Sequence, residues 1–254
     1  MAQAKGFDRK SRHEVALIRE AGRIVAEVHE LVAEAIRPGI STFELDALAE
    51  AHIRKSGASP TFKGYHGFPA TLCMSLNHEV VHGIPRKDRI LNEGDILSVD
   101  CGATYRGMIA DAARTRPVGV ISDELKKLLD ATEESLNAAI AQVRAGNYLE
   151  AVSGAVEDVC QQYGYGLVRN YGGHGTGRKL HEEPFIHNFR TGEPGPLLEV
   201  GAVLAIEPMF NLGTDEVYTA EDNWTVLTKD HLPSAHFENT VVVTDGDPEV
   251  LTQL

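Results

Sequence analysis

Residues 97–111 of this 254-residue chain read LSVDCGATYRGMIAD, a pattern that predicts a β-hairpin. Apolar and polar side chains alternate from Leu97 to Cys101, which is the period of two of a β-strand. Gly107 supplies a turn, and residues 108–110 begin a return strand. We therefore expect two neighbouring antiparallel strands over this stretch.

Two aspartates occupy matching positions on the predicted hairpin. If the turn is centred between Tyr105 and Arg106, Asp100 lies directly opposite Asp111, with Cβ atoms about 5 Å apart. Two like charges at that distance destabilise a hairpin unless a cation or a proton lies between them. Carboxylate oxygens at this separation suit a divalent metal ion. The alternative is a solvated hairpin that carries two surface aspartates.

The composition is that of an ordinary globular protein, with 43% hydrophobic and 24% charged residues. The formal net charge of −13 argues against a surface for nucleic acid or anionic membranes. The first ten residues contain no apolar run typical of a signal peptide, and no stretch is long enough to span a membrane. The cysteines Cys73, Cys101 and Cys160 lack the spacing of a metal site. We expect a cytoplasmic protein without direct nucleic-acid or membrane contacts.

Four helices are predicted from capping residues, helical periodicity and glycine stops. Ser11 and Ser41 each stand three residues before a glutamate, which is the pattern of a capping box. Ser122 opens a third helix, and a fourth begins near Leu149. The predicted helices end near residue 37, at Gly57, at Gly146 and at Gly164.

The chain contains an internal repeat. Gly146 follows Gly39 by 107 residues, and Gly164 follows Gly57 by the same number. At that offset residues 93–100 align with residues 200–207, so that Asp100 matches Glu207. Asp111 matches Glu238 at an offset of 127, because the loop of the second hairpin is about twenty residues longer. Each half is therefore expected to form two helices followed by a hairpin with two carboxylates.

Four carboxylates that converge on one point suit two metal ions better than one. Asp100, Asp111, Glu207 and Glu238 carry four negative charges, which two divalent ions balance at a separation of roughly 3.5–4 Å. His174 lies between glycines in GGHGTG and has little to pack against, so we expect it to be a ligand or a catalytic residue. The alternative for His174 is an ordinary core histidine.

Two further histidines, His82 and His181, lie in polar, turn-rich stretches. Either could donate to an oxyanion or orient an amide, and the alternative for each is an ordinary loop histidine. Residues 78–82 read HEVVH, which matches the zinc-protease helix motif. That motif needs a regular helix, whereas Pro85 and the two valines disfavour one. We therefore expect a strand or turn here and no zinc-protease site.

Several motifs together resemble the methionine aminopeptidases of type I. They are YHGFP at 65–69, HGIP at 82–85, GHGTG at 173–177, HEEP at 181–184 and IEPM at 206–209, with ENT at 238–240. The resemblance covers nearly the whole chain. It implies an α+β "pita-bread" fold with two halves related by a pseudo-two-fold axis, a curved antiparallel sheet that lines the site, and helices outside. We expect a single catalytic domain over residues 1–254, with halves at about 12–118 and 119–250.

The resemblance also implies a dinuclear site that holds Co, Mn, Fe or Zn. In this family pattern Asp100 chelates one ion, Asp111 and Glu238 bridge both, and His174 and Glu207 complete the shell of the second. A water or hydroxide that bridges the ions attacks the first peptide carbonyl. The implied catalytic residues are Glu207 as proton shuttle, His181 on the scissile carbonyl, and His82 on the substrate amide or departing amine.

The implied substrate is a polypeptide with an N-terminal methionine and a small second residue. Aromatic and sulfur-bearing side chains suit a pocket for a thioether. The implied pocket residues are Phe62, Tyr65, Phe68, Cys73, His82, Leu180, His181 and Trp224. The expected partners are N-termini of nascent polypeptides, with the ribosome as a possible further partner, and we expect a monomer.

The chain departs from the family pattern at three positions near the site: Val81, Leu180 and Asn239. None of them is an implied metal ligand, so they bear on the shape of the pocket. Two alternative functions stay open at this point. One is a proline-specific peptidase of the same fold, which would usually carry an extra N-terminal domain. The other is a catalytically inactive binding protein, which we would expect to have lost ligand residues.

Overall fold

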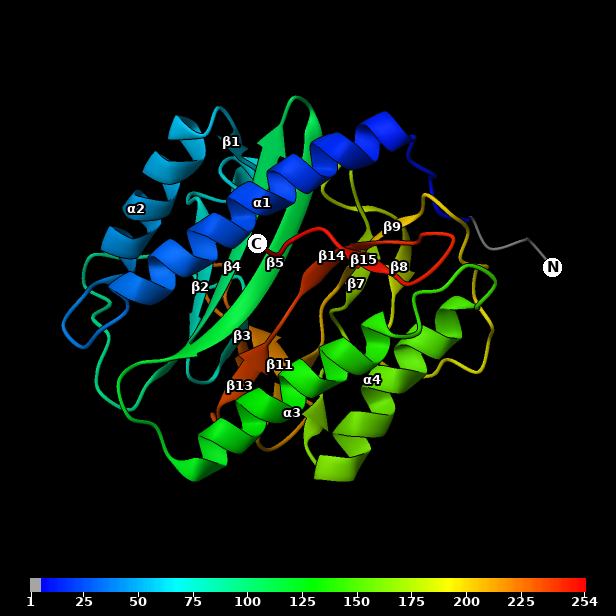
Figure 1. The fold of residues 1–254 in the computed structure, drawn as a ribbon. Coiled ribbons are helices and arrows are strands. Elements are labelled where there is room, and N and C mark those ends of the chain that lie inside the picture. The colour runs from blue at the N-terminus through cyan, green and yellow to red at the C-terminus, as the bar shows by residue number, and fades with distance from the viewer. Residues whose placement is uncertain (1–5) are drawn as a thin grey trace.

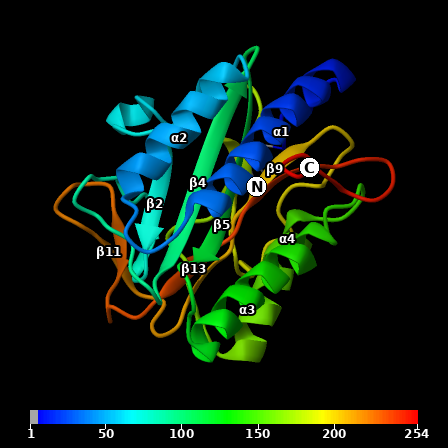
Figure 2. The ribbon, with the colours of Figure 1, turned by 60° about the vertical axis from the view of Figure 1, so that its left-hand side comes forward.

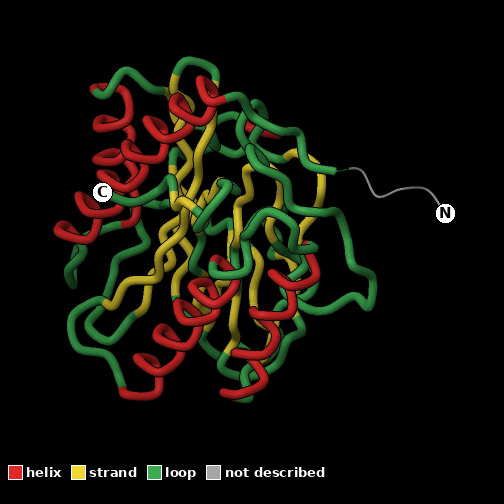
Figure 3. The backbone as a smooth tube through the Cα atoms, turned by 45° about the vertical axis from the view of Figure 1, so that its right-hand side comes forward, coloured by secondary structure: helices red, strands yellow, loops and turns green. Residues whose placement is uncertain are grey.

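The computed structural model describes residues 6–254 and has an α+β architecture, with four α-helices in this part of the chain (Figure 1). The first pair of helices is α1 (Arg12–Ala35) and α2 (Thr42–Lys55), and the second is α3 (Asp123–Ile140) and α4 (Leu149–Tyr163). A 3₁₀ turn, η1, covers Tyr65–Gly67. The strands lie inside and the helices outside them (Figure 3).

The helix starts agree with the capping signals. Ser11 and Ser41 each form the complete capping box with Glu14 and Glu44, so two backbone N–H groups at each helix start are satisfied. Gly164 ends α4 in the left-handed conformation. The predicted end of the third helix at Gly146 is wrong. Helix α3 ends at Ile140 because residues 141–146 form tighter turns, such as the bond from the Val143 N–H to the Ile140 carbonyl.

The long hairpin belongs to an antiparallel sheet in the order β1-β4-β2, with β5 also paired to β4. Its strands are β1 (Ser59–Pro60), β2 (Leu72–Leu76), β4 (Ile96–Tyr105) and β5 (Met108–Pro117). A second antiparallel sheet has the order β15-β14-β9-β7-β8. Its strands are β7 (Gly173–Gly175), β8 (Glu182–Ile186), β9 (Val203–Ile206), β14 (Asn239–Val242) and β15 (Glu249–Val250).

Two three-stranded antiparallel sheets complete the framework, in the orders β13-β10-β6 and β11-β12-β3. They comprise β3 (Glu79–Val81), β6 (Gly166–Leu167), β10 (Met209–Asn211), β11 (Val217–Thr219), β12 (Val226–Thr228) and β13 (Ser234–His236). The HEVVH segment thus contains strand β3 and no helix, as expected. This geometry contradicts the zinc-protease interpretation, which needs both histidines on one helical face.

The register predicted for the hairpin is wrong by two residues. Tyr105 pairs with Met108, so the turn consists of Arg106 and Gly107, both with positive φ (49° and 82°). Positive φ at both central residues is the requirement of a type I′ turn, and glycine meets it without strain. Asp111 therefore lies opposite Gly102 and not opposite Asp100. Because a shift of two preserves the face, both aspartates still point to the same side of the sheet.

Helices α1 and α2 cover one face of the hairpin sheet (Figure 2). Alternate β4 residues, including Leu97, Val99 and Cys101, pack there with Ile24 and Val28 of α1. The remaining β4 residues, Asp100 among them, point to the other face. Helices α3 and α4 pack against strands β6, β9, β10 and β13 through a separate buried cluster. The two helix layers thus leave the carboxylates facing the interior between the sheets.

Within residues 6–254, no helix has the length and apolarity that a membrane crossing requires.

Candidate metal centre and substrate pocket

Five side chains that are far apart in the sequence converge on one cavity of about 930 Å³. Asp100 lies on β4, Asp111 on β5 and His174 on β7, whereas Glu207 directly follows β9 and Glu238 directly precedes β14. Strands β9 and β14 are antiparallel neighbours with Ile206 opposite Asn239, so the two glutamates flank the end of that ladder. These are the five residues that the sequence singled out as ligands.

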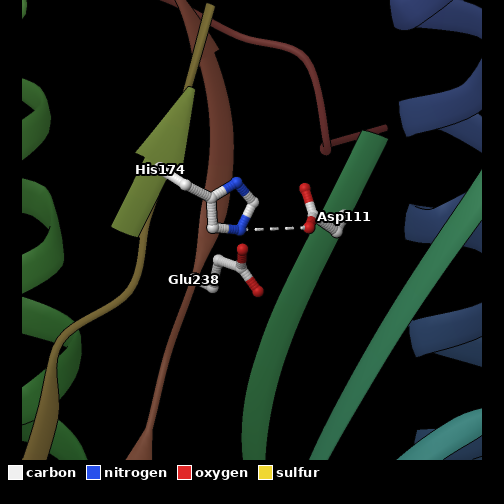
Figure 4. A group of neighbouring side chains, drawn as sticks. All are labelled: Asp111, His174 and Glu238. Carbon is white, nitrogen blue, oxygen red and sulfur yellow. Dashed lines mark ion pairs between the residues drawn. The ribbon is translucent and has the colours of Figure 1, made fainter. Parts of the chain in front are cut away.

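The donor atoms of three of these residues lie within 4.8 Å of one another: Asp111, His174 and Glu238 (Figure 4). The His174 Nε2 atom is 3.7 Å from Asp111 Oδ2 and 3.6 Å from Glu207 Oε1. The other ring nitrogen, Nδ1, is 3.0 Å from the Gly175 carbonyl oxygen. If Nδ1 carries the proton, it donates to that carbonyl and leaves the Nε2 lone pair directed at the carboxylates.

Burial raises the pKa of all four carboxylates, and repulsion by neighbouring carboxylates adds to it at three of them. Burial is the main cause at each of them, and it raises the pKa of Asp111 to about 6. For Asp100, Glu207 and Glu238, the pKa rises well above its ordinary value because burial adds to the negative charge of the neighbours. Burial also lowers the pKa of His174 to about 4, so its imidazole is neutral at pH 7.

This set of donors fits a divalent metal ion. Oxygen ligands with one neutral imidazole suit ions such as Mn, Fe, Co and Zn. Among residues 6–254, the buried Asp100 Oδ1 atom has no hydrogen-bond partner, which is costly for a carboxylate oxygen unless a cation satisfies it. A bound cation would also remove the repulsion that raises the pKa of Asp100, Glu207 and Glu238.

Neighbouring strands hold two of the carboxylates in place. The Thr240 hydroxyl donates to Asp111 Oδ1 at 3.1 Å and lies 2.8 Å from the Asp111 carbonyl oxygen. The Glu238 N–H donates to the Ala113 carbonyl at 2.9 Å, which ties Glu238 to β5. Asn239, one of the departures from the family pattern, accepts from Arg114 Nη2 at 2.6 Å. The carboxylate positions therefore depend on contacts between the two sheets.

The predicted pocket residues all line the same cavity. They are Phe62, Tyr65, Phe68, Cys73, His82, Leu180, His181 and Trp224. The Phe68 and Trp224 rings meet edge to face with centroids 5.1 Å apart, and the Tyr65 hydroxyl is 2.9 Å from His181 Nδ1. Burial lowers the pKa of both His82 and His181 to about 4, with a smaller contribution from a neighbouring histidine in each case. Both are therefore neutral at pH 7.

One buried histidine next to the carboxylates was missed by sequence reasoning. The His236 Nε2 atom lies 3.6 Å from Glu207 Oε2 and has no hydrogen-bond partner among the described residues. It does not line the cavity but lies behind Glu207. Its position two residues before Glu238 was the available signal, because alternate residues of an extended chain share a face.

Glu79 and His78 lie outside the cavity lining formed by the described residues. The Glu79 carboxylate accepts from the Leu76 N–H at 2.8 Å and pairs with Arg89. The His78 ring meets that of His231, with centroids 5.4 Å apart. Glu79 is therefore a buried structural carboxylate, which removes the general base that a zinc-protease reading requires.

Residues 16–245 match metallopeptidase family M24, and the chain belongs to this family. The relatives it resembles at high identity carry one name, methionine aminopeptidase. The chain is 47% identical over 243 residues to that of Clostridium acetobutylicum, which covers 96% of this chain and 97% of the relative. It is 48% identical over 245 residues to methionine aminopeptidase 1 of Bacillus subtilis, covering 96% and 98%.

The solved structures agree with the pita-bread fold. The methionine aminopeptidase of Thermotoga maritima superposes with a TM-score of 0.96 at 39% identity, covering 98% of this chain and all of that one. A prolidase from Pyrococcus furiosus gives a TM-score of 0.78 at 24% identity, and only 65% of its length is covered. The prolidase thus shares the fold. Identity and coverage favour the methionine aminopeptidases over the proline-specific alternative.

Proposed function

We propose that this chain removes the N-terminal methionine from polypeptides whose second residue is small, with two divalent metal ions held by Asp100, Asp111, His174, Glu207 and Glu238. It is a metal-dependent aminopeptidase of family M24, and its high-identity relatives are methionine aminopeptidases. The observation that carries the proposal is the convergence of these five side chains at the base of one cavity with an aromatic and thiol lining.

The charge balance supports two ions. The four carboxylates carry four negative charges, and one divalent ion would leave about two of them uncompensated in the cavity. Asp111 and Glu238 are buried, and Asp100 and Glu207 are half-buried. When bound, such ions act as Lewis acids that lower the pKa of water and polarise a carbonyl group. Asp111 and Glu238 would hold metal together with His174, because ligand atoms of these three residues lie within 4.8 Å of one another.

The other groups of the site suit the remaining steps of peptide hydrolysis. Glu207 lines the cavity beside His174, so its carboxylate is placed to take a proton and deliver it to the departing amine. His181 is neutral and offers one N–H, which suits donation to the carbonyl oxygen as negative charge develops there. His82, partly buried in the cavity lining, is placed to contact the substrate amide.

The pocket chemistry suits a methionine side chain. Phe68, Trp224 and Cys73 give an apolar, polarisable wall, which favours a flexible thioether. The second residue of the substrate would lie near the glycine-rich segment around His174. Gly172 and His174 of that segment line the cavity.

The test is hydrolysis of Met-Ala-Ser by protein supplied with each candidate metal, Mn, Fe, Co or Zn. We expect release of free methionine, no cleavage when the amino group is acetylated, and much slower cleavage of Met-Trp-Ser. Calorimetric titration of the metal-free protein should show two ions bound. Cleavage of Met-Trp-Ser with Met-Ala-Ser untouched would contradict the substrate preference, and cleavage restricted to Xaa-Pro bonds would establish the proline-specific alternative.

We also propose that the cellular substrates are the N-termini of nascent polypeptides, processed in the cytoplasm by a monomer close to the ribosome. The cavity supports this substrate class because it is lined by groups suited to one side chain and one peptide bond. Sedimentation of the purified protein alone and with ribosomes tests the oligomeric state and the association separately.

A further inference from the structure

Two rings that line the cavity, from distant parts of the sequence, meet through a hydrogen bond. The Tyr65 hydroxyl lies 2.9 Å from His181 Nδ1, and the ring centroids are 5.4 Å apart. The residues are 116 positions apart in the sequence, and no element connects them directly. The hydrogen bond therefore depends on how the η1 segment and the turn before β8 are positioned relative to each other.

Both partners are held by rigid local structure. Tyr65 is anchored by its N–H, which donates to the Phe62 carbonyl, and by its own carbonyl, which accepts from the Phe68 N–H. The turn that carries His181 is fixed by the next residue, Glu182. Its carboxylate accepts from the Arg178 and Lys179 N–H groups and forms a buried ion pair with Lys10 at 2.6 Å. The hydrogen bond between the rings is thus set by the fold before substrate arrives.

The protonation states of the two partners restrict how they can bond. The Tyr65 hydroxyl carries one hydrogen, and its oxygen lies 2.9 Å from His181 Nδ1, so the hydroxyl can donate to that nitrogen. A neutral imidazole carries one N–H, so whichever nitrogen accepts a hydrogen bond leaves the other as the donor.

We propose that the Tyr65 hydroxyl donates to His181 Nδ1 and holds His181 in the tautomer that carries its proton on Nε2. No residue within 6–254 forms a hydrogen bond with His181 Nε2, so that N–H is free for a group bound in the cavity. The opposite tautomer would present a lone pair to the carbonyl oxygen of the substrate and repel it. Tyr65 is in this way a positioning residue for His181, an inference that rests on the proposed function.

The test is Tyr65→Phe, which keeps the aromatic wall and removes one hydroxyl. Tyr163→Phe is the matched control, because it also removes one tyrosine hydrogen bond, to Glu134 at 2.7 Å on the exposed side of α4. Nitrogen-15 NMR of histidine-labelled, zinc-loaded protein reads the tautomer directly, and His181→Ala assigns the signal. Kinetics on Met-Ala-Ser supply kcat and KM for each variant.

We expect the wild type and Tyr163→Phe to show His181 protonated on Nε2, and Tyr65→Phe to show a mixture of both tautomers. The kcat of Tyr65→Phe should fall about tenfold, with KM within about twofold and unchanged metal content, since the hydroxyl acts through the transition state. An unchanged tautomer in Tyr65→Phe would overturn the proposal, as would a rise in KM at constant kcat. A wild type that shows the Nε2 tautomer but fails to cleave Met-Ala-Ser would refute the proposed function and leave the tautomer assignment standing.

Discussion

Repulsion by neighbouring carboxylates destabilises the ionised form of three carboxylates of the cavity. Asp100, Glu207 and Glu238 have raised pKa values because burial and neighbouring negative charge act together. Glu79 is equally buried, but Arg89 and the Leu76 N–H compensate its charge. The proposed ligand carboxylates therefore differ from the structural carboxylate Glu79 because a cationic side chain pairs with Glu79.

This difference predicts opposite effects for two alanine substitutions. Glu238→Ala should remove a ligand shared by both ions and lower kcat/KM on the order of a thousandfold or more. Glu79→Ala should lower kcat/KM of the folded, metal-saturated protein by less than about tenfold, or about 1.4 kcal/mol in the barrier, although stability falls. The measurement is kcat/KM at saturating metal for both variants. The reverse order would overturn the assignment of the metal centre.

Substitution of His181 distinguishes a role in stabilising the transition state from a role in binding metal. His181→Ala should retain full metal content, because its Nδ1 is engaged by Tyr65 and it is not one of the five proposed ligands. Its kcat should fall about a hundredfold, as is typical when one donor to an oxyanion is removed. Metal analysis beside steady-state kinetics checks this, and loss of metal would make His181 a ligand.

At the scale of elements, a buried ion pair joins the start of the chain to the turn before β8. Lys10 Nζ lies 2.6 Å from Glu182 Oε2, and the two side chains are only 1% and 9% exposed. Lys10 also donates to the Asp8 carbonyl. Its side chain packs against Gly177 so closely that a Cβ atom added to that glycine would lie 2.5 Å from Lys10 Cε. The segment before α1 therefore closes over the glycine-rich stretch that carries His174.

Removing one partner of this pair should be costly, because it leaves a buried charge without compensation. We expect Lys10→Met to lower the free energy of unfolding by about 3–5 kcal/mol in urea titrations. Arg19→Met is the matched control, since Arg19 pairs with Glu249 on the surface (48% and 39% exposed), and it should cost about 1 kcal/mol or less. Equal costs for the two variants would show that the Lys10 pair is no stronger than a surface pair.

At the scale of the whole molecule, metal binding and protonation compete for the same four carboxylates. In metal-free protein, Asp111 has its pKa raised to about 6 from an ordinary value near 3.8. A raised carboxylate pKa favours the folded state below the ordinary value, and that contribution is lost as the pH rises through 6. A bound cation removes this penalty, because it stabilises the ionised form.

The stabilisation by metal should therefore grow as the pH rises from about 4 to 7. At a free metal concentration a hundred times Kd, it should reach about 2.7 kcal/mol for each ion that binds only the folded state. Thermal unfolding with and without metal, measured in steps of half a pH unit, checks both the sign and the window. A metal effect that shrinks over this range would contradict the role of the carboxylates.

The spacing of two strands matches the offset of the internal repeat. Strand β4 begins at Ile96 and β9 at Val203, 107 residues later, and each has an antiparallel partner that brings the second carboxylate. We propose that the halves are residues 12–118 and 119–250. Superposing one on the other should place Asp100 on Glu207 and Asp111 on Glu238, and a mismatch of strands would contradict these boundaries.

The sequence by itself determined the features that depend on a few neighbouring residues. The capping boxes at Ser11 and Ser41, the strand character of HEVVH and the shared face of Asp100 and Asp111 all follow from local backbone preferences and the period of two. The five converging side chains were also recognised, because the internal repeat links carboxylates that lie more than a hundred residues apart.

Only the tertiary structure decided how these local pieces meet. The hairpin register moved by two residues because the turn took Arg106 and Gly107 into positive φ, which the alternation of side chains does not specify. The position of His236 behind Glu207 depends on contacts between distant strands, as does the hydrogen bond between Tyr65 and His181. Such contacts arise from the packing of whole elements, whereas a local pattern constrains only the face on which a side chain lies.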